Sequence, residues 1–275
     1  MPGRAVEQAK VSRGFVWLLV VVAILGHSTA LFAQTQTTVS QFEGLANSDN
    51  PLLGGISALP PDANLGVGPS HIVQMVNEVG RITDKLGGTL SAFTLNTFFQ
   101  VDPGFLESDP RVIYDASSGR WFATYLQFSD LGLSSALILA VSTTSDPTGT
   151  FCRYRLGNPT AETFIQDFPM LGVSNDKVVV SYNAFDSLSR FLGGGYYVLN
   201  KADLTACAGT LRRVRVTPSL TRVTAHPAQS LGSTSDLYMV MHAPNSNTLS
   251  LLTISGVPGV TTVTRTSTSD RKSVV

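Results

Sequence analysis

Four stretches of this chain can be aligned with one another, and this internal repeat constrains the fold more than any other feature. A Leu-Gly-Val tripeptide at residues 65–67 recurs at residues 171–173, and an asparagine follows each copy at the same distance, Asn77 and Asn183. A Leu-Gly pair at 231–232 begins a further copy, and a fourth, one residue longer, starts near residue 112. The starts lie about 48, 58 and 60 residues apart, a spacing that is typical of β-propeller blades.

The composition favours strands over helices. Charged residues make up 14% of the chain, below the ~25% of ordinary soluble domains, and Thr, Ser and Val are abundant, which suits a pleated surface. In the copy that starts near residue 112, four strand-like segments separated by turn residues predict one blade: residues 111–114, 121–128, 136–143 and 151–156. We therefore expect an all-β fold in which residues 63–269 form about four four-stranded antiparallel blades of an incomplete propeller ring. In the last copy we expect the first strand at residues 229–232.

The N-terminus has the features of a secretory signal peptide over residues 1–33. Arg4, Lys10 and Arg13 precede an apolar run at 15–25, and small residues follow it. A membrane anchor is the alternative, but 11 apolar residues extend only ~16 Å as a helix, against a bilayer core of ~30 Å. We expect cleavage after Ala30 or Ala33, a Pro/Gly-rich lead segment at 34–62, a secreted protein in an extracellular or periplasmic location, and no stable membrane span in the mature chain.

The last six residues, 270–275, match the translation of a sequencing-adapter sequence that ends in a stop codon. We therefore expect a non-native tail there that packs against nothing, and a natural protein that continues beyond residue 269.

The charge balance argues against a nucleic-acid partner. Without the leader and the tail, 14 basic and 17 acidic side chains remain, and a mildly acidic domain does not attract polyanions. Histidines lack metal-ligand spacing, so no metal site is expected from them.

Cys152 and Cys207 are the two cysteines of the chain, and they lie 55 residues apart, almost one repeat. An oxidising compartment allows a disulfide between them. Two unpaired cysteines acting as small hydrophobic residues are the alternative, and the sequence leaves both open.

A set of short segments, spread over roughly residues 42–205, forms a recognisable pattern: Pro60-Pro61-Asp62, Val67-Gly68-Pro69, Asp109-Pro110, Tyr114-Asp115, Asp146-Pro147 and Asp167-Phe168-Pro169. Together they resemble a group of uncharacterised secreted bacterial β-propeller proteins, distantly similar to sialidases. The resemblance implies secretion and a propeller fold. It implies no agreed activity, so the catalytic residues stay unknown.

A sialidase Asp-box places Gly two residues and Trp five residues after its Asp. Here Gly119 and Trp121 follow Asp115 by four and six residues. This difference in spacing argues against a sialidase-like enzyme.

Three aspartates are the best candidates for binding a ligand. Asp62, Asp109 and Asp167 each come just before the first strand of a repeat, and in a propeller those positions gather at one end of the central channel. There they could bind a cation such as calcium or a polar ligand, although Asp at such positions is also ordinary turn chemistry. Trp121 could stack on a sugar, although strand aromatics more often fill the core.

We therefore expect a secreted propeller that acts as a binding or scaffold module for an extracellular ligand, either a glycan or a protein. The alternative is a sialidase-like, glycan-active enzyme, which would require catalytic carboxyl groups to converge at the channel mouth.

Overall fold

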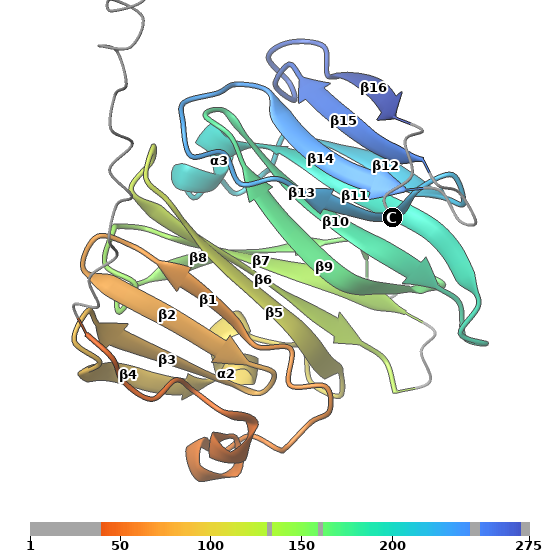
Figure 1. Ribbon diagram of the computed structural model, residues 1–275. Helices are drawn as coiled ribbons and strands as arrows, with labels where there is room; N and C mark the ends of the chain where they lie inside the picture. The colour runs from red at the N-terminus through yellow and green to blue at the C-terminus, as the bar shows by residue number, and fades with distance from the viewer. Residues whose placement is uncertain (1–39, 131–133, 159–161, 243–247, 271–275) are drawn as a thin grey trace, which may run out of the picture. The chain divides into compact units, whose positions relative to one another are not determined.

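The computed structural model describes residues 40–130, 134–158, 162–242 and 248–270. Within these residues, strands β1 to β16 form four four-stranded antiparallel sheets, each made of strands consecutive in the chain. Figure 1 shows the sheets following one another from orange through green to blue. The all-β propeller architecture that the repeat predicts is confirmed, and the first and fourth sheets exchange no strand among the described residues.

The first blade contains β1 (Asn64–Val67), β2 (His71–Val76), β3 (Val79–Asp84) and β4 (Thr89–Thr94). The second contains β5 (Leu106–Asp115), β6 (Arg120–Phe128), β7 (Ser135–Ser142) and β8 (Phe151–Leu156). The third contains β9 (Ile165–Val173), β10 (Lys177–Phe185), β11 (Phe191–Asn200) and β12 (Arg213–Ser219). The fourth contains β13 (Val223–Pro227), β14 (Leu237–His242), β15 (Leu249–Ser255) and β16 (Thr264–Asp270). Two five-residue helices, α2 (Leu95–Phe99) and α3 (Lys201–Thr205), follow β4 and β11.

The first strand of each blade is the innermost. β1 lies beside β5, β5 beside β9, and β9 beside β13. β1 and β5 run in the same direction, since Asp62 lies close to Asp109 and Gly66 lies close to Ile113. We call the end at which the innermost strands begin the leading end, and the opposite end the trailing end. The turn between β2 and β3, Asn77–Glu78, belongs to the leading end because β2 runs antiparallel to β1.

Neighbouring blades enclose hydrophobic cores because successive side chains of a strand point to opposite faces. Along β6, Trp121 and Tyr125 pack in the core shared with the first blade, whereas Phe122 and Leu126 pack in the core shared with the third. A further core lies between the third and fourth blades. All eight residues of β7 are buried, because the second blade is covered on both faces.

A backbone kink recurs at the leading end of every innermost strand. The φ angle is 45° at Asp62, 59° at Asp109, 52° at Phe168 and 45° at Thr224. Residues other than glycine rarely adopt this region, and for a bulky or β-branched residue it is an outlier. The strand register shifts at the kinks of β5, β9 and β13.

The kinks of the second, third and fourth blades are each hydrogen-bonded to the preceding blade. The Asp109 N–H donates to Asn77 Oδ1 (3.1 Å), and the Phe168 N–H donates to Asp109 Oδ2 (3.0 Å). The Thr224 N–H donates to Asn183 Oδ1 (3.0 Å). The two asparagines of the sequence repeat, Asn77 and Asn183, therefore have equivalent structural roles, since each accepts a hydrogen bond from the N–H at the kink of the next blade.

The fourth blade begins earlier than the sequence pattern predicts. β13 ends at Pro227, and the predicted first strand at 229–232 is part of a loop in which Leu231 is fully exposed. Asp236 precedes β14 as Asp176 precedes β10, but the connection at 228–236 is longer than the one at 174–176. The Leu-Gly pair at 231–232 is therefore not the equivalent of the earlier Leu-Gly pairs.

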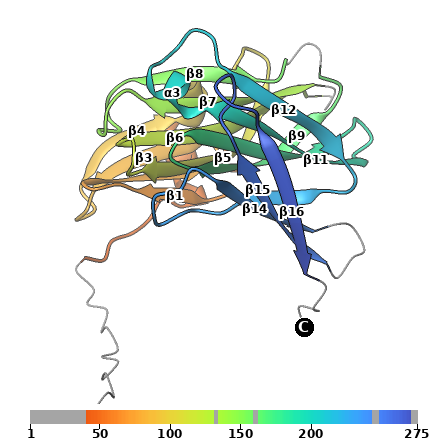
Figure 2. The ribbon, with the colours of Figure 1, turned by 90° about the horizontal axis from the view of Figure 1, so that it is seen from above.

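Both ends of the chain extend beyond the described residues. The described part of the lead segment holds two 3₁₀ turns, η1 (Asn47–Asp49) and η2 (Pro51–Leu53). The expected signal peptide at 1–33 and residues 271–275 of the expected tail lie outside the described residues. Asp270, the first residue of the expected tail, pairs with Leu249 in β16, the edge strand of the fourth sheet (Figure 2), so the expectation that the tail packs against nothing is wrong for this residue. In the described ranges, no helix is both long and apolar enough to span a bilayer.

A disulfide and an ion pair are among the links between the second and third blades. Cys152 of β8 and Cys207, which follows α3, form a disulfide with their Cα atoms 5.7 Å apart. At the trailing end, the buried Lys201 Nζ lies 2.5 Å from Asp115 Oδ2 and donates to Ser117 Oγ. Of the two states that the sequence leaves open for the cysteines, the structure has the disulfide.

We expect the Cys152→Ser/Cys207→Ser double variant to lower the free energy of unfolding by about 2–4 kcal/mol, because the bond closes a long loop in the unfolded chain. Urea unfolding with and without reductant measures this change. Reductant should destabilise the wild-type protein and leave the variant unaffected. Two titratable thiols in the unreduced, urea-denatured wild type would contradict the disulfide.

Candidate functional site

Aspartates from three blades meet at the leading end. Asp62 forms the kink before β1, Asp109 forms the kink in β5, and Asp167 directly precedes the kink residue of β9. Asp62 lies within hydrogen-bonding reach of Asp109, and Asp109 within reach of Asp167. The structure thus places the three aspartates singled out in the sequence beside one another, although Asp167 sits one residue before its blade's kink.

Polar neighbours fix two of these carboxyl groups. Asn77 Nδ2 donates to Asp62 Oδ2 (2.8 Å), and Ser108 Oγ donates to Asp109 Oδ1 (2.9 Å). The other oxygen of Asp109 accepts the Phe168 N–H. Asp109 therefore has a structural task, since its carboxyl group holds the kink of the third blade.

Burial raises the pKa of all three aspartates, and their proximity adds to this effect. For Asp62, burial is the largest cause and the Asp109 charge adds to it, while the Asn77 hydrogen bond opposes it. The pKa of Asp109 rises through burial and the charge of Asp167. The pKa of Asp167 rises through burial and the charge of Asp62. Neighbouring carboxylates do not all ionise readily, so this cluster retains protons more strongly than free aspartates.

One cation lies beside the aspartates. Arg111 Nε donates to the Pro169 carbonyl oxygen (3.2 Å), and its guanidinium carbon lies 5.0 Å from the centre of the Phe168 ring. Its charge lowers the pKa of Asp62 and so offsets part of the burial effect. Arg111 is thus held by contacts with the third blade, and its charge lowers the pKa of Asp62 beside the first blade.

A pocket of about 620 Å³ opens at the leading end, against the first and second blades. The lead segment forms one of its walls. Its acidic lining side chains are Asp62, Glu78 and Glu107, and none of the described residues that line it is basic. Its apolar lining comes from Ile56, Leu59, Leu106 and Phe128. Its volume lies within the ~300–1,000 Å³ of small-molecule sites.

Glu78 and Glu107 are the residues that the sequence did not reveal as candidates. Burial and the charge of Glu107 raise the pKa of Glu78 to about 7. Burial also raises the pKa of Glu107, while the hydrogen bond that Asn96 Nδ2 donates to Glu107 Oε1 (3.0 Å) opposes this rise. The only sequence signal was indirect, since Glu78 follows the repeated Asn77.

Tyr125 connects the glutamates to the aspartates. Its hydroxyl group donates to the Asn77 carbonyl oxygen (3.3 Å). Burial, and then the charges of Glu107, Glu78 and Asp109, raise the pKa of Tyr125. The phenol therefore lies close to carboxyl groups of both sets, so the pocket and the aspartate cluster form one acidic site.

Trp121 does not contribute to this site. It is fully buried, and its Nε1 donates to the Ser145 carbonyl oxygen (3.0 Å). A Cβ atom at Gly68 would lie 2.6 Å from its ring, so the glycine is required for this packing. The ring offers no face to a sugar, and the sequence-based suggestion that Trp121 binds ligand is corrected: it is a core residue.

No group of three or more acidic, histidine or cysteine side chains among the described residues is arranged to hold a metal ion. The carboxyl groups of the aspartates are engaged with one another and with Asn77, Ser108 and Phe168. The geometry thus gives no support to the calcium ion that the sequence suggested.

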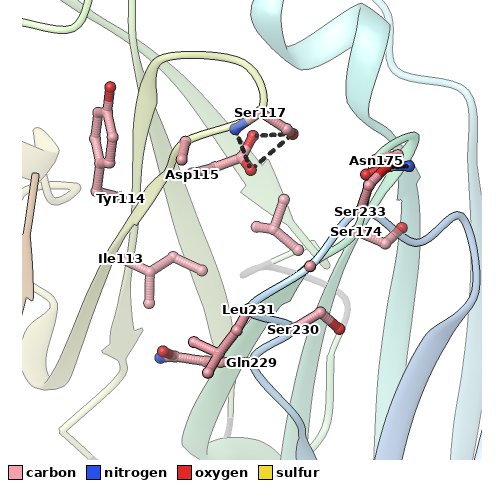
Figure 3. Close-up of a pocket in the computed structure, with 13 residues that line it drawn as sticks. Ile113, Tyr114, Asp115, Ser117, Ser174, Asn175, Gln229, Ser230, Leu231 and Ser233 are labelled. Atoms are coloured by element: carbon pink, nitrogen blue, oxygen red, sulfur yellow. Dashed lines mark hydrogen bonds between the residues drawn. The ribbon is translucent and has the colours of Figure 1, made fainter. Parts of the chain in front are cut away.

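A second pocket, of about 470 Å³, lies at the trailing end (Figure 3). Its walls come from the ends of β5 and β9 and from the loop that carries Ser230 and Leu231. Its polar groups bond mainly to each other: Asn175 Nδ2 donates to Ser233 Oγ (2.8 Å), and Ser117 Oγ donates to Asp115 Oδ1 (2.9 Å). This pocket brings together no pair of carboxyl groups, so the leading-end pocket is the stronger candidate.

Comparison with known proteins gives solved structures but no sequence relative. No protein-family model matches the chain, and no curated protein matches it in sequence. An exo-β-1,3-galactanase from Phanerochaete chrysosporium is similar in structure at 10% identity and a TM-score of 0.43, over 76% of this chain and 51% of that one. An exo-β-1,3-galactanase from Clostridium thermocellum is 11% identical with a TM-score of 0.43, over 84% of this chain and 51% of that one. A GH43 endo-arabinanase from Bacillus licheniformis is 13% identical with a TM-score of 0.40, over 72% of each chain.

The chain spans about half the length of these galactanases. At such identities the likeness concerns the fold, and no residue role passes from those enzymes to this chain. All three matched proteins are nevertheless glycan-degrading enzymes by name. These names stand against the expectation of a propeller that serves only as a binding or scaffold module, and its alternative, a glycan-active enzyme, is taken up below as a proposal.

The raised carboxyl pKa values predict how stability depends on pH. A carboxyl group that keeps its proton in the folded chain, after the unfolded chain has lost it, makes the free energy of unfolding fall as pH rises. For Glu78 this window runs from about 4.5 to about 7. We expect the wild type to lose stability across this window and the Glu78→Gln variant to lose less. Urea unfolding at pH 5, 6, 7 and 8 measures both slopes.

The matched control is Glu43→Gln, because Glu43 is an exposed glutamate away from the pocket. Its stability should follow the wild type at every pH. Equal slopes for the wild type and Glu78→Gln would contradict the raised proton affinity of Glu78.

Proposed function

We propose that this chain is a secreted enzyme that hydrolyses glycosidic bonds in the leading-end pocket. The observation that carries the proposal is the pair of glutamates in one pocket, with the pKa of Glu78 raised to about 7 beside Glu107. Glycoside hydrolysis generally uses two carboxyl groups in different protonation states. Environments that separate the pKa values of two such groups assign them the acid and base roles.

Glu78 has the properties of the general acid. With its pKa raised to about 7, Glu78 keeps a proton near neutral pH that it can donate to the leaving-group oxygen as the glycosidic bond breaks. Glu107 is the partner carboxyl group in this proposal: burial raises its pKa too, but the hydrogen bond that Asn96 donates opposes this rise and favours the charged form. It would activate water or stabilise the positive charge that develops on the sugar ring. Asp62 is the third carboxyl group of the pocket wall.

The charge of the pocket favours neutral glycans. Its described lining holds three acidic side chains and no basic one, so it repels a carboxylated or sulfated sugar. A sialic acid would need a cation to bind its carboxylate, and Arg111 is already bonded to Pro169. The names of the matched enzymes point to galactan and arabinan, both neutral polysaccharides, and this agrees with the pocket better than a sialidase activity does.

Secretion is part of the proposal and rests on two features. The basic and apolar pattern of residues 1–33 is that of a signal peptide. The disulfide between Cys152 and Cys207 suits an oxidising compartment. A secreted enzyme of this kind would meet polysaccharides outside the cell.

The test is hydrolysis of β-1,3-galactan, α-1,5-arabinan and a panel of other neutral polysaccharides by the full chain, measured as released sugar. We expect Glu78→Gln and Glu107→Gln each to lower kcat about 10²–10⁴-fold, the usual contribution of acid–base catalysis. We also expect the wild-type kcat/KM to fall as pH rises through about 7, because Glu78 then loses its proton.

Glu43→Gln serves again as the matched control and should retain wild-type activity, since Glu43 lies outside the pocket. Full activity of Glu78→Gln on any substrate that the wild type cleaves would refute the role of Glu78. Release of no sugar from any member of the panel by folded wild-type protein would refute the hydrolase proposal.

A further inference from the structure

Asn77 makes more contacts in the acidic site than its place in the repeat requires. It is 3% exposed and occupies the turn between β2 and β3, with a φ angle of 24°. Its Oδ1 accepts the Asp109 N–H, and its Nδ2 donates to Asp62 Oδ2 and to the Pro60 carbonyl oxygen (2.6 Å). Its own carbonyl oxygen accepts the Tyr125 hydroxyl group. One side chain thus joins the lead segment, the first blade and the second blade.

The repeat supplies an internal comparison for this residue. Asn183 accepts the kinked N–H of Thr224 just as Asn77 accepts that of Asp109. The Nδ2 of Asn183, however, donates to Thr224 Oγ1 (3.0 Å), which belongs to the same kink. The donation from Asn77 to a carboxyl group is therefore not part of the link between blades and needs a separate explanation.

The surroundings of Asp62 supply that explanation. Asp62 faces two other carboxyl groups, Asp109 and Asp167, and the charge of Arg111. A carboxyl group among others is poorly oriented unless a fixed donor holds one oxygen, and the Asn77 amide is a neutral donor that does so. Asn77 also directly precedes Glu78, whose charged neighbour is Glu107. The same side chain therefore anchors the turn that presents Glu78 to the pocket.

We propose that Asn77 is the positioning residue of the acidic site: it orients the Asp62 carboxyl group and holds the turn that carries Glu78. This inference rests on the proposed hydrolase function for its catalytic consequence, but its structural content is independent of it. Removal of the Nδ2 donor should leave Asp62 with higher proton affinity and should release the Glu78 turn.

The Asn77→Gly variant isolates the side chain, because glycine adopts positive φ without strain. Asn77→Asp is the second variant: it keeps an oxygen that can accept the Asp109 N–H and loses only the donor, with an added charge. Asn183→Ala is the matched control, since it removes the equivalent link between blades, and the Nδ2 of Asn183 donates to Thr224 Oγ1 rather than to a carboxyl group. Urea unfolding first establishes that each variant is folded.

The decisive measurement is the pH titration of the Asp62 carboxyl carbon by NMR in the full chain. We expect the pKa of Asp62 to be higher in Asn77→Gly and Asn77→Asp than in the wild type, and to be unchanged in Asn183→Ala. A wild-type titration of Asp62 in whichever Asn77 variant is folded would overturn the proposal. An equal shift in Asn183→Ala would also overturn it, because the effect would then follow from loosened blades.

Activity on the polysaccharide that the wild type cleaves supplies the second readout. We expect Asn77→Gly to lower kcat about 10²-fold, the order of loss that misplaced catalytic groups produce, with KM little changed. An unchanged kcat in that variant would overturn the positioning role while leaving the hydrolase proposal intact. If the folded wild type cleaves nothing and the Asp62 titration still shifts, the hydrolase proposal fails and the orientation of Asp62 by Asn77 stands.

Discussion

The hydrogen bond from a kinked backbone N–H to the preceding blade is the interaction on which this structure depends. It occurs at Asp109, Phe168 and Thr224, where the innermost strand leaves its regular ladder. An extended strand would direct these N–H groups along its own sheet. The left-handed kink turns them sideways, so that each blade is fixed to the one before it. The unusual φ angles cost free energy, and they persist at these positions because the surrounding contacts hold the backbone in place.

The same kinks explain why acidic groups collect at one end of the blades. Asp adopts this backbone region more readily than most residues, and Asp62 and Asp109 occupy two successive kinks, whereas Phe168 and Thr224 occupy the other two. The burial of the two aspartates beside Asp167 then raises their proton affinity. Glu78 enters the same region through the β2–β3 turn. The kinks that join the blades and the β2–β3 turn thus bring acidic side chains together at the leading end.

The strand pattern was predictable from the sequence because it depends on local periodicity and turn residues. The start of the fourth blade was not, since the Leu-Gly pair at 231–232, where a strand was expected, lies in the longer loop at 228–236. The meeting of Asp62, Asp109 and Asp167 followed from their similar places near the start of the innermost strands, although Asp109 and Asp167 lie within β5 and β9 rather than before them. Glu78 could not be found in this way, because its raised pKa comes from burial and from Glu107, a neighbour that only folding brings near.

The most direct test of this account is the NMR titration of the Glu78 side-chain carboxyl carbon in the folded, full-length protein. We expect a pKa of about 7 for Glu78, displaced from the ordinary value of 4.5. A Glu78→Gln variant identifies the resonance by its loss. A titration midpoint near 4.5 would contradict the claim that the leading end forms a buried acidic site able to donate a proton at neutral pH.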